Sequence, residues 1–282
     1  MSEFRIVCDS ACDLSSEMLR KRNVTCVPLS VSFDGGGSVD STDFYNQMRS
    51  GRVAKTAGAN VEAFREAFTP ILEGGMDILY LGFSSALSMT YGSARIARDE
   101  LQRDFPERRI ITLDSLSASA GIALLLDRLL RFCDLDEAVS YAERTKLKIC
   151  HLFTVDNLDY LKRGGRVSPT TAIVGNMLGI KPMLFVDNRG RLIPRSKVRG
   201  RHKSIERLAE DFALLREEDE VYISHADCMR DAETLSEILR TKYDAKVRLI
   251  TNIGPVIGSH SGPGTLALFF IGRERPPSKT GD

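Results

Sequence analysis

A short apolar run that leads through a polar loop into a helical pattern decides the fold class. It reads Asp77-Ile78-Leu79-Tyr80-Leu81-Gly82-Phe83, then Ser84 to Thr90, then Tyr91 to Phe105. The same order recurs in the first half of the chain, where apolar runs predict strands at 4–8, 26–33, 77–83 and 109–113 and amphipathic segments predict helices at 61–72, 91–105 and 118–132. Such alternation is typical of a parallel sheet with crossover helices.

The pattern changes after about residue 150. Predicted strands at 181–186 and 191–197 flank Asp187-Asn188-Arg189-Gly190, which is typical of a hairpin. Further strands are predicted at 220–224, 246–251 and 266–271, and helices at 157–162, from Ser168-Pro169 and from Ser204. We therefore expect two α/β domains with a ligand site between them: a parallel N-terminal domain at 1–150 and a mixed C-terminal domain at 151–282, with chain segments free to cross over. The polar tail from Arg273 is expected to fray.

Composition argues against several classes of protein. The chain has 282 residues, a formal net charge of +1 and no tryptophan, which gives no basic surface or stacking platform for nucleic acid. No apolar run approaches the ~20 residues that span a membrane, and no signal peptide is evident. The six cysteines are scattered without a C-x-x-C pair, so we expect reduced thiols, a cytoplasmic location and no metal site.

Three polar loops follow predicted strands: Asp9 to Asp13, Ser84 to Thr90, and Asp114 to Ser117. Ligands of open parallel sheets bind beyond the carboxyl ends of the strands. Ser85, Ser88 and Thr90 would stand at a helix N-terminus, where free N–H groups favour an anion, although helix capping alone explains Ser88 or Thr90. For Asp9 and Asp13 we expect a structural role in the first strand-to-helix turn rather than a catalytic one.

The C-terminal region carries a glycine- and proline-rich segment, Ile253 to Gly264, which we expect to form a loop between two apolar runs. His260 within it is a candidate anion ligand or general base, and a structural histidine bonded to backbone is the alternative. Two basic turns, 162–166 and 197–201, add Arg166 and Arg199 as candidates for phosphate or acidic-partner contact.

Three motifs together carry a resemblance to a known family. They are Ser85-x-Leu87-Ser88-x-Thr90-Tyr91, Asp156-Asn157-Leu158-x-Tyr160-Leu161-x-x-Gly164-Gly165-Arg166 and Gly254-Pro255-Val256-Ile257-Gly258-x-His260-x-Gly262-Pro263-Gly264. Their order and spacing resemble the DegV family of bacterial lipid-binding proteins, and the resemblance runs from Asp9-Ser10-x-x-Asp13-Leu14 almost to the C-terminus. Some members are the fatty-acid-binding subunit of a bacterial fatty acid kinase.

The resemblance implies a carrier without catalysis of its own. A long-chain fatty acid such as palmitate or oleate would lie between the two domains, with its carboxylate held by Thr56 and Ser88 and with His260 close by. A separate ATP-dependent kinase subunit would phosphorylate that carboxylate, facing Arg166 and Arg199, and no cofactor is expected. The ligand-binding residues predicted from the loops and the resemblance together are Thr56, Ser85, Ser88, Thr90, His260 and Gly262.

This chain departs from the family pattern at two places. The family usually reads Thr-Ser-x-Pro where this chain has Thr56 followed by Ala57, Gly58 and Ala59, and usually has glycine at the position of Met89.

Two other functions are alternatives to a fatty acid carrier. One is an enzyme of acyl or phosphoryl transfer that uses His260 as base, with Ser88 or Asp9 as partner. The other is a regulatory module that senses lipid and contacts a partner through the turns around Arg166 and Arg199.

Overall fold

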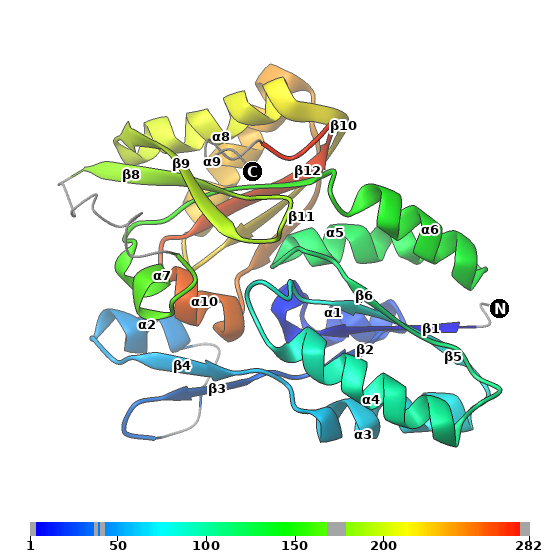
Figure 1. Cartoon of the computed structure of the whole chain (residues 1–282). Coiled ribbons are helices and arrows are strands. Elements are labelled where there is room, and N and C mark those ends of the chain that lie inside the picture. Colours follow the sequence, from blue (N-terminus) through cyan, green and yellow to red (C-terminus); the bar gives the residue numbers. More distant parts are fainter. Residues whose placement is uncertain (1–3, 37–38, 40–42, 168–178, 277–282) are drawn as a thin grey trace.

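A four-stranded parallel sheet forms the first half of the molecule (Figure 1). The computed structural model describes residues 4–36, 39, 43–167 and 179–276, so the helix predicted from Ser168 lies outside the described residues. The strands are β1 (Phe4–Asp9), β2 (Thr25–Val27), β5 (Asp77–Gly82) and β6 (Ile110–Asp114), in the order β2-β1-β5-β6. All neighbours pair in parallel, which confirms the sheet predicted from the alternating pattern.

Helices cover both faces of this sheet because side chains alternate along each strand. In β5, Ile78 and Tyr80 pack against the helices α3 (Val61–Glu73) and α4 (Thr90–Asp104), whereas Leu79 and Leu81 face α5 (Ala120–Leu129). Asn60 starts α3 as predicted, since its side chain accepts a hydrogen bond from Ala63 N at 2.9 Å. This half also contains η1 (Ser10–Cys12), α1 (Ser16–Lys21) and α6 (Leu135–Thr145).

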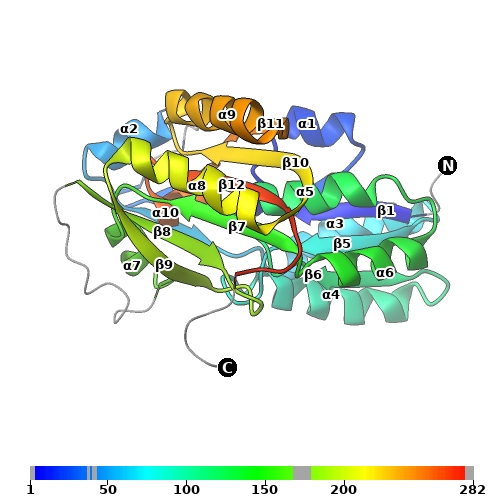
Figure 2. The ribbon, with the colours of Figure 1, turned by 90° about the horizontal axis from the view of Figure 1, so that it is seen from above.

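A six-stranded mixed sheet forms the second half, in the order β11-β10-β12-β7-β8-β9. Its strands are β7 (Ile149–Thr154), β8 (Ile180–Val186), β9 (Leu192–Arg199), β10 (Arg216–His225), β11 (Lys246–Asn252) and β12 (Leu266–Gly272). The predicted hairpin is confirmed, because β8 and β9 are antiparallel and Gly190 N donates to Asp187 O at 3.0 Å in their turn. The helices α8 (Arg201–Leu215) and α9 (Met229–Tyr243) lie over this sheet (Figure 2).

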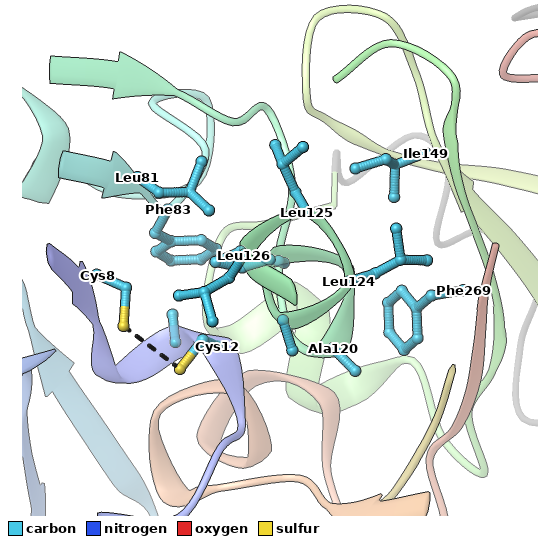
Figure 3. Packing of buried hydrophobic residues seen from close by; sticks show 14 of the residues in the cluster. Cys8, Cys12, Leu81, Phe83, Ala120, Leu124, Leu125, Leu126, Ile149 and Phe269 are labelled. Carbon is cyan, nitrogen blue, oxygen red and sulfur yellow. Dashed lines mark hydrogen bonds between the residues drawn. The ribbon is translucent and has the colours of Figure 1, made fainter. Parts of the chain in front are cut away.

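Helix α5 packs between the two sheets (Figure 3). Leu126 faces Cys8 and Cys12 of the first half, and Leu124 faces Phe269 of the second. All of these side chains are buried, so the two halves share one hydrophobic core. The second sheet starts with β7 one residue before the expected domain boundary, and the division into 1–150 and 151–282 stays a prediction.

The segment predicted as one strand at 26–33 is two strands. Pro28 follows β2, and the chain turns away from the parallel sheet before β3 (Ser30–Phe33) begins, since proline has no N–H for the ladder. β3 pairs antiparallel with β4 (Ala54–Ala57), where Val31 lies opposite Thr56. Thr56 therefore stands on a strand, β4. The helix α2 (Phe44–Arg49) connects the two strands.

Two C-terminal predictions are wrong. The segment from Ile253 to Gly264 contains a helix, α10 (Pro255–Ser261), which begins with a proline at its first turn and packs against α7 (Asp159–Arg163) and the β3–β4 pair (Figure 1). The frayed tail expected from Arg273 is wrong for 273–276, because the Arg275 side chain is buried, and residues 277–282 lie outside the described residues. Its guanidinium donates to the main-chain oxygens of Ile149 at 2.9 Å, Leu116 at 2.9 Å, Asp187 at 2.8 Å and Lys146 at 2.8 Å.

None of the helices in the described residues is long and apolar enough to cross a membrane. All six cysteines are free thiols, and Cys8 and Cys12 lie 3.9 Å apart between their sulfur atoms within the core.

Candidate functional site

A pocket lies between the two sheets, where the carboxyl ends of β1, β5 and β6 meet the inner face of the six-stranded sheet. The pocket and its open mouth together hold about 980 Å³ of space that no atom fills. Most of its wall is hydrocarbon, as in ligand pockets generally. The apolar side chains that line it come from both halves of the fold and include Leu29, Leu87, Phe153, Val186, Ala267 and Phe269.

Helix α10 supplies one wall of this pocket. Val256, Ile257, His260 and Ser261 of the helix line the pocket, and Ile253 just before the helix does so too. The segment that looked like a glycine-rich loop therefore contains a helix that presents both apolar and polar side chains to the pocket.

Four polar side chains of the lining, Thr56, Ser88, Arg166 and His260, form a cluster that we call the polar end of the pocket. Ser119, His151, Ser261 and Thr265 also line the pocket. Thr56 Oγ1 lies 2.7 Å from His260 Nε2, although the two residues are 204 positions apart in the chain. Alternation along β4 explains the orientation of Thr56, because Ala54 and Thr56 are half-buried while Lys55 and Ala57 are exposed. The structure thus brings together four of the residues that the sequence predicted.

His260 is a neutral imidazole at neutral pH. Burial, and then the positive charge of Arg166, lower its pKa to about 4. Its Nδ1 atom is buried and has no hydrogen-bond partner among the described residues. A neutral ring carries one N–H, so His260 either donates to Thr56 or accepts its hydroxyl proton, while Nδ1 faces the backbone of Gly164.

Ser88 is held by its neighbours in a turn before α4. Its Oγ atom accepts a hydrogen bond from Thr90 N at 3.2 Å and lies 2.8 Å from Thr90 Oγ1. Neither residue is the helix cap, because that position belongs to Met89 and carries no side-chain capping bond. Thr90 is fully buried and accepts from Ala59 N at 3.3 Å, so Thr90 supports the Ser88 hydroxyl, which faces the pocket.

Arg166 closes the polar end of the pocket. Its Nε atom donates to Leu87 O at 3.1 Å, and its Nη1 atom donates to Gly164 O. These bonds join the loop before α4 to the loop after α7, and they leave a positive charge beside the Thr56–His260 pair. An anion at this end of the pocket meets two hydroxyls, an imidazole and a guanidinium.

Two glycines allow α7 and α10 to interlock. A Cβ atom at Gly164 would lie 2.1 Å from His260 Nδ1, and one at Gly262 would lie 2.3 Å from the Tyr160 ring. Both distances are far below van der Waals contact, so no side chain fits at either place. Gly164 is thus a residue of the site that was not predicted as one. Its presence in the family motif from Asp156 to Arg166 was the one sign in the sequence that it could matter. Gly262 supports the wall by packing on Tyr160 and does not line the pocket.

Two other predicted residues lie away from the pocket wall. Ser85 is exposed, and its N–H donates to Asp114 Oδ1 at 3.2 Å. Arg199 is exposed at the end of β9. Neither residue lines the pocket, so their roles toward ligand or partner remain predictions.

The two aspartates of the first turn are structural, as expected. Asp9 accepts hydrogen bonds from Tyr80 Oη at 2.7 Å, Phe83 N at 2.8 Å and Ala11 N at 3.1 Å. These bonds fix the end of β1 against β5. Asp9 does not line the pocket, which removes it from reach of His260 in the enzymatic alternative.

The departures from the family pattern are compatible with this geometry. Met89 has a φ of −74°, which any residue adopts, and 81% of its side chain is exposed at the rim of the pocket. Ala59 uses its N–H to bond Thr90 Oγ1, a contact that a proline at this place cannot make.

Comparisons with known proteins agree with this architecture. Residues 3–273 match the family model described as "Uncharacterised protein, DegV family". The DegV domain-containing protein CPE0026 of Clostridium perfringens is 42% identical, over 98% of this chain and 100% of its own length. A stearic acid-binding protein from Eubacterium ventriosum superposes with a TM-score of 0.85 at 27% identity, covering 95% of this chain and 98% of its own.

A solved structure of lower sequence identity has the same fold. The Fak B3 protein of the Streptococcus pneumoniae fatty acid kinase, loaded with linoleic acid, shares the fold with a TM-score of 0.84 at 22% identity. The alignment covers 96% of this chain and 99% of that one. Since the family match spans nearly every residue and both sheets have counterparts in solved relatives, this chain belongs to the DegV family.

Proposed function

We propose that this protein binds one long-chain fatty acid in the pocket between its sheets, with the carboxylate at the polar end formed by Thr56, Ser88, Arg166 and His260. The observation that carries the proposal is a mostly apolar wall joined, within one pocket, to this cluster of four polar side chains. The stearic acid bound by the Eubacterium relative supports the same ligand class.

The energetics favour a ligand with a long apolar tail. Burying about fifteen methylenes at ~0.8 kcal/mol each gives on the order of 12 kcal/mol of gross stabilisation. Loss of translational freedom and ordering of the chain offset much of this gain. The carboxylate would lose far more than it gains if it were buried without partners, so a tail-binding pocket needs a polar end of this kind.

The headgroup site suits a carboxylate that reacts further. Neutral hydroxyls from Thr56 and Ser88 donate to the carboxylate without neutralising it, and two nitrogens of Arg166 already donate to backbone oxygens. The mouth beside Ser88 is bordered by the exposed Met89 side chain, so the carboxylate would lie near the surface. We therefore propose that a separate ATP-dependent kinase subunit phosphorylates it there, and that Arg199 contacts this partner or the acyl phosphate.

The enzymatic alternative has weaker physical support. The Thr56–His260 pair resembles a hydroxyl with its base, but a general base works best when its pKa lies near the working pH, and that of His260 is lowered to about 4. Turnover of an acyl phosphate or acyl ester by the isolated chain, abolished in His260→Ala, would reverse this ranking.

Ligand release followed by headgroup mutagenesis tests the proposal. Mass spectrometry of gently denatured protein should release a fatty acid. Thr56→Val and Ser88→Ala should each weaken the binding of oleate about tenfold, since each removes one hydrogen bond to a charged group. Ser85→Ala is the matched control, because Ser85 is exposed and off the pocket, and it should bind like the wild type. A protein that purifies empty and ignores added palmitate and oleate contradicts the proposal.

A further inference from the structure

The motif Asp9-Ser10-x-x-Asp13 ends in a carboxyl group that joins distant parts of the fold. Asp13 is 6% exposed and has a φ of 56°. Its Oδ1 atom accepts a hydrogen bond from Gly254 N at 2.9 Å, and its Oδ2 atom accepts one from Ser119 Oγ. Its main-chain oxygen accepts from Thr251 Oγ1 at 2.8 Å. One residue of the first half thus contacts α5, the end of β11 and the start of α10.

These contacts lead directly to the fatty acid pocket. Gly254 immediately precedes the first residue of α10, the helix that forms one wall and carries His260. Ser119 itself lines the pocket, and its Oγ atom also lies 3.0 Å from Ser224 Oγ. The φ of 57° at Ser119 is unusual for a residue other than glycine, so the surrounding bonds hold its backbone in place. Asp13 therefore touches the pocket wall from behind at two points.

The printed donors to the Asp13 carboxyl are neutral groups, the Ser119 hydroxyl and the Gly254 N–H. Burial raises its pKa to about 7, and the bonds from Ser119 and Gly254 oppose this shift only in part. The charge of Asp13 in turn raises the pKa of the Tyr45 hydroxyl, after the larger effect of that group's own burial. The other titratable or charged side chains on the elements that Asp13 adjoins or contacts are Arg5, Cys8, Asp9, Cys12, Asp127, Arg128, Lys246, Arg248 and His260.

We propose that Asp13 is a positioning residue for fatty acid binding, and that the protonation of its carboxyl is coupled to occupancy of the pocket through Ser119 and α10. Through Gly254 the carboxyl fixes the start of α10 and so the place of His260 against Thr56. This inference rests on the proposed function, since it assigns a role to a residue behind that site.

The direction of the coupling follows from desolvation. A fatty acid tail against Ser119 replaces water near the Asp13 carboxyl with hydrocarbon, which disfavours the ionised form and raises its pKa further. By linkage, the protein then binds fatty acid more tightly when Asp13 is protonated. If the ligand raises the pKa by one unit, affinity falls about tenfold between about pH 6 and about pH 9.

Binding of oleate across this pH range, measured by displacement of a fluorescent fatty acid, tests the coupling. Asp13→Asn mimics the protonated carboxyl, so its affinity should stay at the wild-type low-pH value and exceed the wild-type affinity about tenfold at about pH 9. Asp9→Asn is the matched control, because Asp9 is also buried in this segment but does not contact α10. It should keep the wild-type pH dependence, and ionisation of the ligand itself is common to all three proteins.

Carboxyl carbon NMR of the wild type gives a second readout that does not depend on any variant folding. One aspartate should titrate near neutral pH in the free protein and at higher pH with oleate, and the Gly254 amide proton should follow the same titration. A wild-type pH profile retained in Asp13→Asn, or an Asp13 titration that oleate leaves unchanged, overturns the inference. Failure of the wild type to bind oleate at any pH overturns the proposed function. If the chemical shift of the Gly254 amide proton in the free protein does not change as Asp13 titrates, the positioning role alone is overturned.

Discussion

The α-carbon of Gly164 faces the imidazole of His260 so closely that a Cβ atom there would lie 2.1 Å from Nδ1. The ring meets this backbone on one side and Thr56 on the other, with 2.7 Å between Nε2 and Oγ1. The place of the histidine is thus set by the absence of a side chain as much as by a hydrogen bond.

Substitution of Gly164 tests whether the position of the His260 ring matters for fatty acid binding. Gly164→Ala forces the His260 ring to move, and we expect fatty acid affinity to fall by about 1–3 kcal/mol, or roughly fivefold to 150-fold. Gly92→Ala in α4 is the control, because a Cβ atom there meets nothing within 4 Å. It should leave affinity unchanged and stabilise the helix slightly, by up to ~1 kcal/mol. Competition with a fluorescent fatty acid measures both variants.

Titration of His260 should report the arrival of the carboxylate. In the free protein its ring resonances should titrate near the depressed pKa of about 4, and a bound carboxylate should raise that pKa because it favours the imidazolium. Because the pKa of His260 is lower in the folded protein than in the unfolded chain, its contribution to the free energy of unfolding is fully present above about pH 6.5. This contribution is lost as the pH falls toward the folded-state pKa of about 4. Nitrogen-edited NMR with and without oleate, assigned with His260→Gln, measures the shift; a ring that titrates at its ordinary pKa in the free protein contradicts this account.

A larger side chain at a position on β12 should shorten the space for the fatty acid tail. Ala267 lines the pocket, and the buried side chains on either side of it, Leu266 and Leu268, belong to the core under α8 and α9. Ala267→Leu should exclude about two methylenes of the tail, which weakens stearate by ~1.6 kcal/mol, or about fifteenfold. Laurate, with its shorter tail, serves as the internal control and should keep its affinity. Equal losses for both acids would show that the tail does not pass Ala267.

Arg275 should contribute strongly to stability although it lies near the C-terminus. Its guanidinium satisfies main-chain oxygens of both halves, and burial lowers its pKa only to about 10, so it stays charged at neutral pH. Arg275→Met leaves these buried oxygens without donors, and we expect a loss of about 3 kcal/mol or more in the free energy of unfolding. Arg273→Met, at an exposed position, should change it by less than about 0.5 kcal/mol. Denaturant unfolding at constant m-value compares the two.

Periodicity was enough to predict most of the strands and helices, because each buries one face against a neighbour. It failed where distant contacts override local pattern. Ile253 to Gly264 has the glycine and proline content of a loop, yet Asp13 and the β3–β4 pair hold its centre as a helix. Likewise, Arg275 sits in a polar tail whose burial depends on carbonyl groups more than eighty residues away in the chain.

The headgroup site was predictable in composition but not in geometry. Ser88 and His260 were predicted from polar loops and the family resemblance, and Thr56 from the resemblance alone; all three line one pocket. The motif alone did not reveal that Thr56 lies on a strand, that Thr90 supports Ser88 from behind, or that Gly164 makes room for His260. Each of these depends on a contact between segments that no single stretch of sequence contains.

The pairing of Asp13 with Gly254, which are 241 residues apart, has a consequence for synthesis on the ribosome. A nascent chain can complete its parallel sheet long before α10, the helix that carries His260, has been synthesised. Closing so long a loop is entropically slow, and the contact between Asp13 and Gly254 forms only after that closure. The proposed binding of a fatty acid would therefore begin only after both sheets have been synthesised, so the apolar pocket does not exist while the N-terminal half folds.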